Sequence, residues 1–135
     1  MPASMFTRIS AICAAATLTV LSAAAPAAAA AAAADRTAEI NGGRMTFIDD
    51  GDVFKICDLL KNGKGVYGAV FYNSYWDTSG YKRVMTISDG GDPGCDKKGY
   101  NIGNSGTYTF VICEGRYPTR PIVTHPCDDS GEFNE

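Results

Sequence analysis

Histidine is almost missing from this chain of 135 residues, in which His125 is the only one. A Ser-His-Asp or Cys-His catalytic arrangement would have to use this residue, which lies between a threonine and a proline near the C-terminus. The G-x-S-x-G pattern of a nucleophile elbow is also missing. Paired carboxylates of the glycosidase type need a cleft, and a chain this short has little room for one. The sequence therefore predicts a protein that is not an enzyme.

Closely spaced metal ligands are missing as well. A zinc site needs cysteines in pairs two to four residues apart, whereas the cysteines of this chain are far apart. Aspartates gather between Asp49 and Asp52 and again at Asp89, Asp92 and Asp96, but without the D-x-D-x-D-G spacing of an EF-hand. Aspartate beside glycine is ordinary turn chemistry. The sequence predicts no metal and no cofactor, and calcium binding by the second aspartate group stays an open alternative.

Long hydrophobic runs are confined to the N-terminus. Arg8 is the only charged residue of the first 34, and it precedes an apolar stretch, residues 9–21, and an alanine-rich stretch that ends at Ala34. This order is typical of a secretory signal peptide, here residues 1–34, with a small-residue cleavage site. A retained membrane anchor is the alternative. The mature protein is expected to be secreted, extracellular and soluble, with no membrane association after cleavage.

The mature part is poor in helix formers. Removal of residues 1–34 leaves 101 residues (135 minus 34), which fits one small domain. All 15 glycines lie in this part, and of the alanines only Ala38 and Ala69 remain. It holds 11 basic residues (12 minus Arg8) against 15 acidic ones, a net charge of −4. This composition favours strands and turns, and the acidic balance argues against nucleic-acid partners.

Alternating apolar residues between turn signals predict five strands, at residues 44–49, 52–59, 65–73, 81–89 and 106–114. The prolines of the C-terminal part allow at most a short edge strand near Pro121–Thr124. We therefore expect an all-β fold, a single small antiparallel β-sandwich of five or six strands, either immunoglobulin-like or an open barrel. The sandwich is predicted to span residues 44–127, between a flexible N-terminal segment, 35–43, and a flexible tail, 128–135.

Cysteines become an even set of four once Cys13 leaves with the signal peptide, so two disulfides are expected in an oxidising compartment. Strand alternation places Cys57 and Cys113 on the faces opposite the aromatic residues of their strands. Each cysteine would then bond to a segment that lies over the outside of the sandwich. This predicts Cys57–Cys95, which tethers the glycine-rich segment 88–106, and Cys113–Cys127, which tethers the tail. A cross-strand Cys57–Cys113 bond is the alternative.

Four segments resemble a group of small secreted proteins of actinomycetes: DDGDVFKICD, NGKGV, SDGGDPGCD and YNIGNSGTYTFVIC. The resemblance covers residues 45–114 and implies an extracellular β-sandwich. It brings no catalytic or binding residues. In architecture alone the chain is also similar to the small two-disulfide amylase inhibitors of streptomycetes, which present an exposed W-R-Y triplet where this sequence has SYWD.

Aromatic residues surround a polar hairpin tip in the segment FYNSYWDTSGY. A polar loop has little reason to carry such rings unless they pack on the sheet or meet a partner, to which they offer large rigid contact areas. In extended backbone the adjacent Tyr75 and Trp76 point to opposite sides, so at least one should be exposed. Packing of Phe71 and Trp76 in the core is the alternative. The candidate binding residues are Tyr72, Tyr75, Trp76, Asp77 and Tyr81.

The sequence thus predicts a secreted, monomeric binding module that recognises an extracellular protein or glycan through this loop. The alternatives are a secreted inhibitor of an extracellular hydrolase, a small structural protein without a ligand, and, third, a small enzyme that uses His125.

Overall fold

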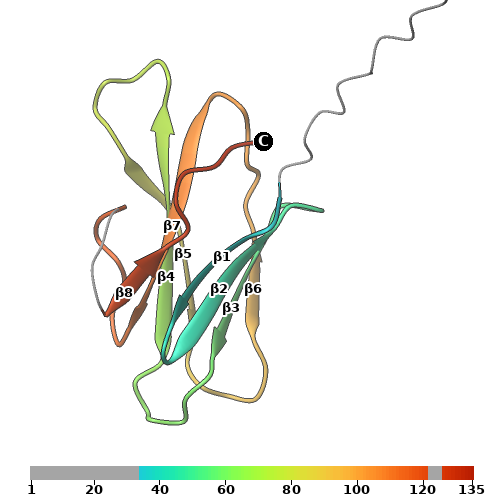
Figure 1. Ribbon diagram of the computed structural model, residues 1–135, viewed down its shortest axis with the longest axis vertical. Helices are drawn as coiled ribbons and strands as arrows, with labels where there is room; N and C mark the ends of the chain where they lie inside the picture. The colour runs from blue at the N-terminus through green and yellow to red at the C-terminus, as the bar shows by residue number, and fades with distance from the viewer. Residues whose placement is uncertain (1–33, 122–125) are drawn as a thin grey trace, which may run out of the picture.

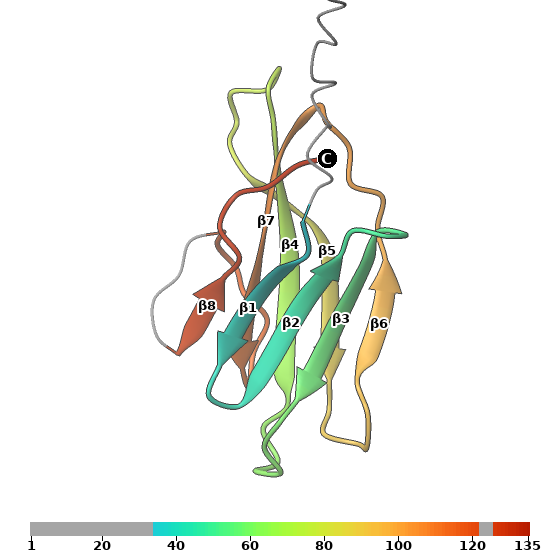
Figure 2. The ribbon, with the colours of Figure 1, turned by 45° about the vertical axis from the view of Figure 1, so that its right-hand side comes forward.

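Two antiparallel sheets of four strands each face one another in the computed structural model, which describes residues 34–121 and 126–135 (Figures 1 and 2). One sheet has the order β1-β2-β3-β6 and the other β5-β4-β7-β8. The strands are β1 (Arg36–Ile40), β2 (Gly43–Ile48), β3 (Val53–Asp58), β4 (Val66–Ser74), β5 (Lys82–Asp89), β6 (Asp96–Gly99), β7 (Gly106–Glu114) and β8 (Cys127–Asp129). The predicted all-β sandwich is confirmed. The predicted signal peptide, apart from Ala34, and the predicted edge strand beyond Pro121 lie outside the described residues.

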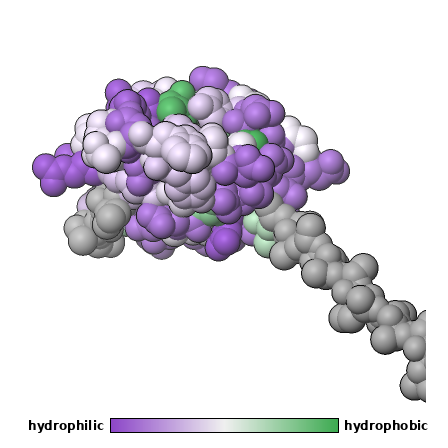
Figure 3. Space-filling model, turned by 90° about the horizontal axis from the view of Figure 1, so that it is seen from above, coloured by the Kyte–Doolittle hydropathy of each residue, from purple (hydrophilic) through white to green (hydrophobic). Residues whose placement is uncertain are grey.

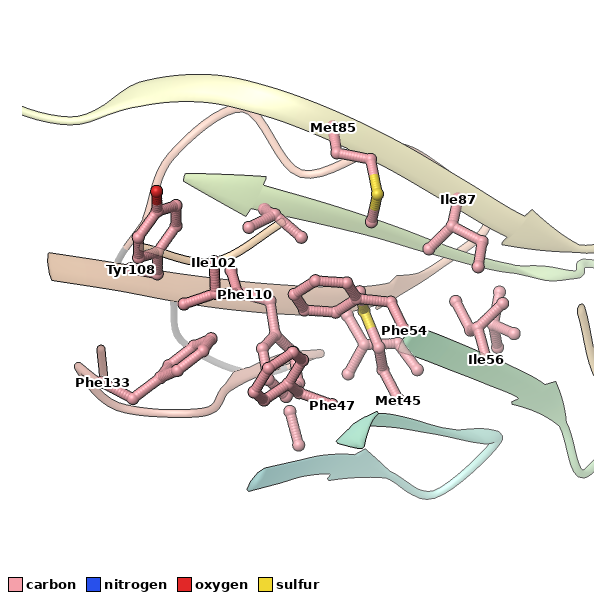
Figure 4. Packing of buried hydrophobic residues seen from close by; sticks show 14 residues of the cluster. Met45, Phe47, Phe54, Ile56, Met85, Ile87, Ile102, Tyr108, Phe110 and Phe133 are labelled. Carbon is pink, nitrogen blue, oxygen red and sulfur yellow. The ribbon is translucent and has the colours of Figure 1, made fainter. Parts of the chain in front are cut away.

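Alternation along the strands builds the core between the sheets. In β2 the fully buried side chains are Met45 and Phe47, and in β3 they are Phe54 and Ile56, so every second residue faces inward. The ring of Phe54 lies 4.9 Å from that of Phe47 and meets Phe110 of β7 edge-on at 5.6 Å (Figure 4). Such aromatic contacts add to the free energy gained from burial of apolar area.

Gly68 of β4 sets how closely the two sheets approach. A Cβ at this position would lie 2.4 Å from Sδ of Met45 on the facing sheet and 3.1 Å from a methyl carbon of Ile87. Neither distance leaves room for another carbon atom. The side chain of Met45 therefore occupies the space that a side chain at position 68 would need.

Polar contacts tie the edges of the two sheets together. On one side the backbone N–H of Glu39 in β1 donates to the carboxylate of Asp128 in β8, at 2.9 Å. On the other side Nζ of Lys98 in β6 donates to the carbonyl oxygen of Thr86 in β5, at 3.0 Å. A lysine on an edge strand also discourages pairing with another chain.

The structure contains the two predicted disulfides, Cys57–Cys95 and Cys113–Cys127, which rules out the cross-strand alternative. Cys57 points away from the core, as expected from its place in β3. Cys113 also lies on the outer face of its sheet, but there it is buried in a second small apolar cluster with Ala69, Phe71 and Val111. Phe71, which one alternative placed in the main core, belongs to this outer cluster.

Two strands lie where the sequence pattern predicted none. β1 occupies the segment expected to be flexible, and β6 occupies the middle of the segment expected to be a connection. β1 buries only Ala38 completely, and all four residues of β6 are exposed. Both are edge strands, held by backbone pairing with β2 and β3, and such strands need no apolar alternation that a sequence pattern could reveal.

The tail also differs from the expectation, because residues predicted to be flexible complete the core. β8 pairs with β7, and the ring of Phe133 lies 5.1 Å from that of Phe47 and 5.8 Å from that of Phe110. Two backbone hydrogen bonds, of 2.7 and 2.9 Å, join Phe133 to Tyr108. Strands and core contacts therefore begin at β1 and extend to Phe133, beyond both limits of the predicted range 44–127. A single aromatic residue in a polar tail forms no periodic pattern, so the sequence did not predict that the tail docks on the core.

Candidate functional site

The hairpin between β4 and β5 projects from one end of the sandwich, where the β2–β3 turn, the β6–β7 connection and the C-terminus also lie (Figures 1 and 2). We call residues 74–82 the aromatic tip. Figure 3 looks onto this end, which is mostly hydrophilic, with pale side chains of intermediate hydropathy at its centre and only small hydrophobic patches.

Local hydrogen bonds shape the aromatic tip. The N–H of Asp77 donates to the carbonyl of Ser74 at 3.4 Å, which closes a β-turn with Tyr75 and Trp76 at its centre. The hydroxyl of Ser74 accepts from the N–H of Trp76 at 3.2 Å, and the carboxylate of Asp77 accepts from the N–H of Ser79 at 2.9 Å. Serine and aspartate commonly form such turn contacts with backbone N–H groups close by in sequence.

Tyr75 and Trp76 are both exposed, with exposed fractions of 59% and 88%. The expectation that at least one ring would be exposed is confirmed, but its geometric reason was incomplete. The two residues occupy the centre of a turn rather than extended backbone, so neither side chain is directed into the core. The alternative that Trp76 packs in the core is wrong.

The structure holds Tyr75 at two points. Its N–H donates to the carbonyl of Ser105 in the β6–β7 connection at 3.1 Å, and its hydroxyl accepts from Nδ2 of Asn134 at 3.1 Å. For Trp76 the described contact is the backbone bond to Ser74. The tip therefore combines one fixed aromatic ring with one that stands free.

Asp77 and Lys82 form an exposed ion pair across the base of the tip. The hydrogen bond from Lys82, followed by the N–H of Ser79, holds the pKa of Asp77 well below its usual range. Exposed pairs contribute little to stability because water and salt screen them. Their effect here is local: the two opposite charges beside Trp76 are matched within the tip itself.

Tyr72 and Tyr81 lie on opposite faces of the sheet. Tyr72 packs against the main core, with its ring 4.7 Å from that of Tyr108 and its hydroxyl 2.9 Å from that of Ser105. Tyr81 packs against the outer cluster, where its hydroxyl meets Thr107 and the carboxylate of Glu132. Burial first, and then Glu132, raise the pKa of Tyr81. Of the five predicted site residues, the tip thus presents Tyr75, Trp76 and Asp77 together.

Asp52 braces the connection that carries Ser105. Its carbonyl accepts from the N–H of Tyr100 at 3.0 Å, and its carboxylate accepts from the N–H of Ile102 at 3.2 Å. The backbone of Asp52 has a φ of 53°, a left-handed conformation that aspartate tolerates better than most residues. Ile102 is completely buried, so the connection is anchored from both sides.

Gly106 lets this connection reach the base of the hairpin. A Cβ on Gly106 would lie 2.2 Å from the carbonyl oxygen of Asn73 and 2.6 Å from the ring of Tyr72. The first residue of β7 therefore has to be glycine for β4 and β7 to pair as far as Ser74.

Sequence reasoning missed the residues that support the tip. Ser105, Asn134 and Glu132 lie in a connection and a tail, and no spacing relates them to the aromatic hairpin. Glu132 and Asn134 lie beside the hairpin because Phe133, between them, pairs with Tyr108 and packs in the core. Phe133 was the one feature of the tail sequence that could have indicated this docking.

The aspartates of the glycine-rich segment have separate roles. The buried carboxylate of Asp89 accepts from the N–H groups of Asp58, at 2.7 Å, and Gly91, at 3.2 Å, which ties β5 to the end of β3. Asp92 and Asp96 are exposed. Within residues 34–121 and 126–135 no three His, Cys, Asp or Glu side chains gather in a way that could hold a metal ion.

No known protein-family model, curated protein or solved structure matches this chain. In the described part of the chain, none of the secondary structure is a helix of the length and apolarity needed to cross a bilayer.

Proposed function

We propose that this protein is a secreted, monomeric binding module that holds an extracellular protein or glycan through the aromatic tip. The observation that carries the proposal is the 88% exposure of Trp76 on a turn whose backbone is held by hydrogen bonds. Because the backbone of the turn is already held, an aromatic anchor carried on it loses less conformational entropy when it binds. Recognition residues commonly lie on loops of this kind, carried by a rigid sheet.

Binding rather than catalysis fits the chemistry of the tip. Its groups are aromatic rings and hydroxyls, with Asp77 as the single carboxylate, already paired with Lys82. The two disulfides support an extracellular location, because such bonds persist mainly in oxidising compartments.

The test is retention of the purified secreted protein on partners from its native culture supernatant. We expect Trp76→Ala to lose retention while its melting temperature stays that of the wild type, because the ring makes no core contact. Leu59→Ala is the matched control, since Leu59 is 50% exposed but lies in the β3–β4 connection, at the opposite end of the sandwich (Figure 1). Equal retention of wild type and Trp76→Ala would contradict the proposal.

One observation favours a second candidate, a secreted inhibitor of an extracellular hydrolase. The tip projects beyond the rest of the domain, so it has the shape to enter an active-site cleft (Figure 1). Incubation with a panel of secreted hydrolases separates the two functions: an inhibitor lowers the rate of one of them, and Trp76→Ala removes that effect.

A further inference from the structure

We propose that the ligand of the aromatic tip is a neutral glycan built of pyranose rings, which stacks on Trp76 and hydrogen-bonds to the Tyr75–Asn134 pair. This inference rests on the proposed function and narrows it to one class of partner. Three properties of the tip support it: its small apolar area, its charge balance and its hydrogen-bonding groups.

The apolar area of the tip suits a sugar better than a protein. In the described part of the chain, the large exposed hydrophobic residues at this end are Tyr75 and Trp76, whereas Leu59 and Leu60 lie at the other end. A stable protein interface buries about 800 Å² on each partner around a core enriched in apolar and aromatic groups. A pyranose ring needs only one flat aromatic face for its C–H side. The exposed uncharged polar residues of this end include Thr78, Ser79, Asn104, Ser105 and Asn134. The tip also carries the ion pair of Asp77 and Lys82.

The charges near the tip select against an acidic ligand. Asp77 and Lys82 form an ion pair, whereas Glu132 accepts a hydrogen bond from the neutral hydroxyl of Tyr81 and keeps its negative charge. Glu135 follows Asn134 and is exposed, so Glu132 and Glu135 together place negative charge beside the tip. An acidic polysaccharide would be repelled by it, whereas a neutral glycan would not.

The hydrogen bond between Tyr75 and Asn134 leaves groups free to bind hydroxyls. Nδ2 of Asn134 donates to the hydroxyl of Tyr75, so that hydroxyl still has its own hydrogen to donate. Asn134 keeps its carbonyl oxygen as an acceptor and has a second N–H. Donors and acceptors side by side suit sugar hydroxyls, which act as both. Because Ser105 also fixes the backbone of Tyr75, these groups are oriented before the ligand arrives.

Trp76 is the only tryptophan of the chain, so its fluorescence reports on this site alone. The experiment titrates the secreted protein with two neutral polymers, hydroxyethylcellulose and glycol chitin, and with acidic polygalacturonate. We expect a blue shift of the emission with at least one neutral polymer and none with the acidic one, because stacking replaces water around the indole ring.

The affinity of each variant for the polymer is then measured by its retardation in native gels that contain the polymer. Trp76→Ala is expected to bind about 30-fold more weakly, as expected for loss of a central aromatic anchor, and Trp76→Phe to recover part of the loss. Asn134→Ala should bind about fivefold more weakly through loss of one hydrogen bond. The matched control is Asn41→Ala, an exposed asparagine in the turn between β1 and β2.

Three results would overturn the inference, and they separate it from the proposed function. If neither neutral polymer shifts the emission while the supernatant test still shows retention that depends on Trp76, the glycan assignment fails and the proposed function stands. If the acidic polymer binds and the neutral ones do not, the charge argument is wrong. If neither the polymers nor the supernatant show binding that depends on Trp76, both proposals fail.

Discussion

The adjacent residues Tyr75 and Trp76 differ in how the rest of the protein holds them, and this difference suits the tip to binding. Tyr75 is fixed by Ser105 and Asn134, whereas Trp76 extends into solvent from the same turn. The fixed ring limits the conformations of the turn, and the free ring offers its faces to a ligand. Both properties depend on close contacts at the base of the hairpin, where Gly106 lies.

Gly106→Ala should therefore destabilise the protein and disturb the tip. The added Cβ would lie 2.2 Å from the carbonyl of Asn73, and overpacking of this kind costs about 1–3 kcal/mol. Gly103→Ala is the matched control, because a Cβ there meets nothing within 4 Å. Urea denaturation of both variants measures the difference. A loss of stability that is equal in the two variants would show that the contact with Asn73 has no special cost.

Tyr108 gives a pH dependence that is tested in alkaline solution. Burial raises the pKa of its hydroxyl above about 10, the value of an unperturbed tyrosine. At a pH between the pKa of Tyr108 in the unfolded chain and its higher pKa in the folded protein, the hydroxyl is ionised in the unfolded chain and protonated in the folded protein. The free energy of unfolding is therefore unaffected below about pH 10 and falls as the pH rises toward the folded pKa.

We expect Tyr108→Phe to show a smaller fall in stability than the wild type as the pH rises above about 10, since one raised pKa is removed. Absorbance titration of the folded protein should find Tyr81 and Tyr108 among the last of the seven tyrosines to ionise. Identical alkaline curves for wild type and Tyr108→Phe would contradict this account.

The edge strands β1, β6 and β8 are the elements that the sequence predicts least well, and the reason is physical. The central strands β2, β3, β4 and β7 and the edge strand β5 were all predicted close to their observed bounds. β2, β3 and β5 alternate more and less buried residues, and β4 and β7 carry apolar runs that are buried on both faces. β1 and β6 gain their place from backbone pairing, and β6 also from the bond between Cys57 and Cys95 beside it. Backbone hydrogen bonds leave no pattern in side chains.

The Cys57–Cys95 disulfide should hold β6 to the sandwich. It closes a separation of 38 residues, for which chain entropy gives about 4 kcal/mol, against about 3 kcal/mol for the 14-residue separation of Cys113–Cys127. We expect the double variant Cys57→Ala/Cys95→Ala to lose about 4 kcal/mol of stability. Relative to the wild type, hydrogen exchange should speed up more at the amides of β6 than at those of β7. Unchanged exchange in β6 would mean that its pairing with β3 is sufficient without the disulfide.

Whole-molecule assembly explains why only part of the site was predictable. The aromatic hairpin could be chosen from local composition, because Trp and Tyr on a polar loop are unusual. Its supporting residues come from the β6–β7 connection and from the tail, which reach the hairpin only after the sheets have packed and Phe133 has entered the core. Tyr72 and Tyr81 were grouped with the tip because they flank it in sequence, and strand alternation separates them in the fold.

The central claim is that a partner covers Trp76, and collisional quenching of its fluorescence by acrylamide tests this most directly. In the free protein the 88% exposed ring should be quenched almost as readily as free tryptophan. With the retained partner bound, we expect the quenching constant to fall several-fold, because the covered ring is shielded from acrylamide. An unchanged quenching constant in the bound complex would contradict the account, since the partner would then be held by another surface.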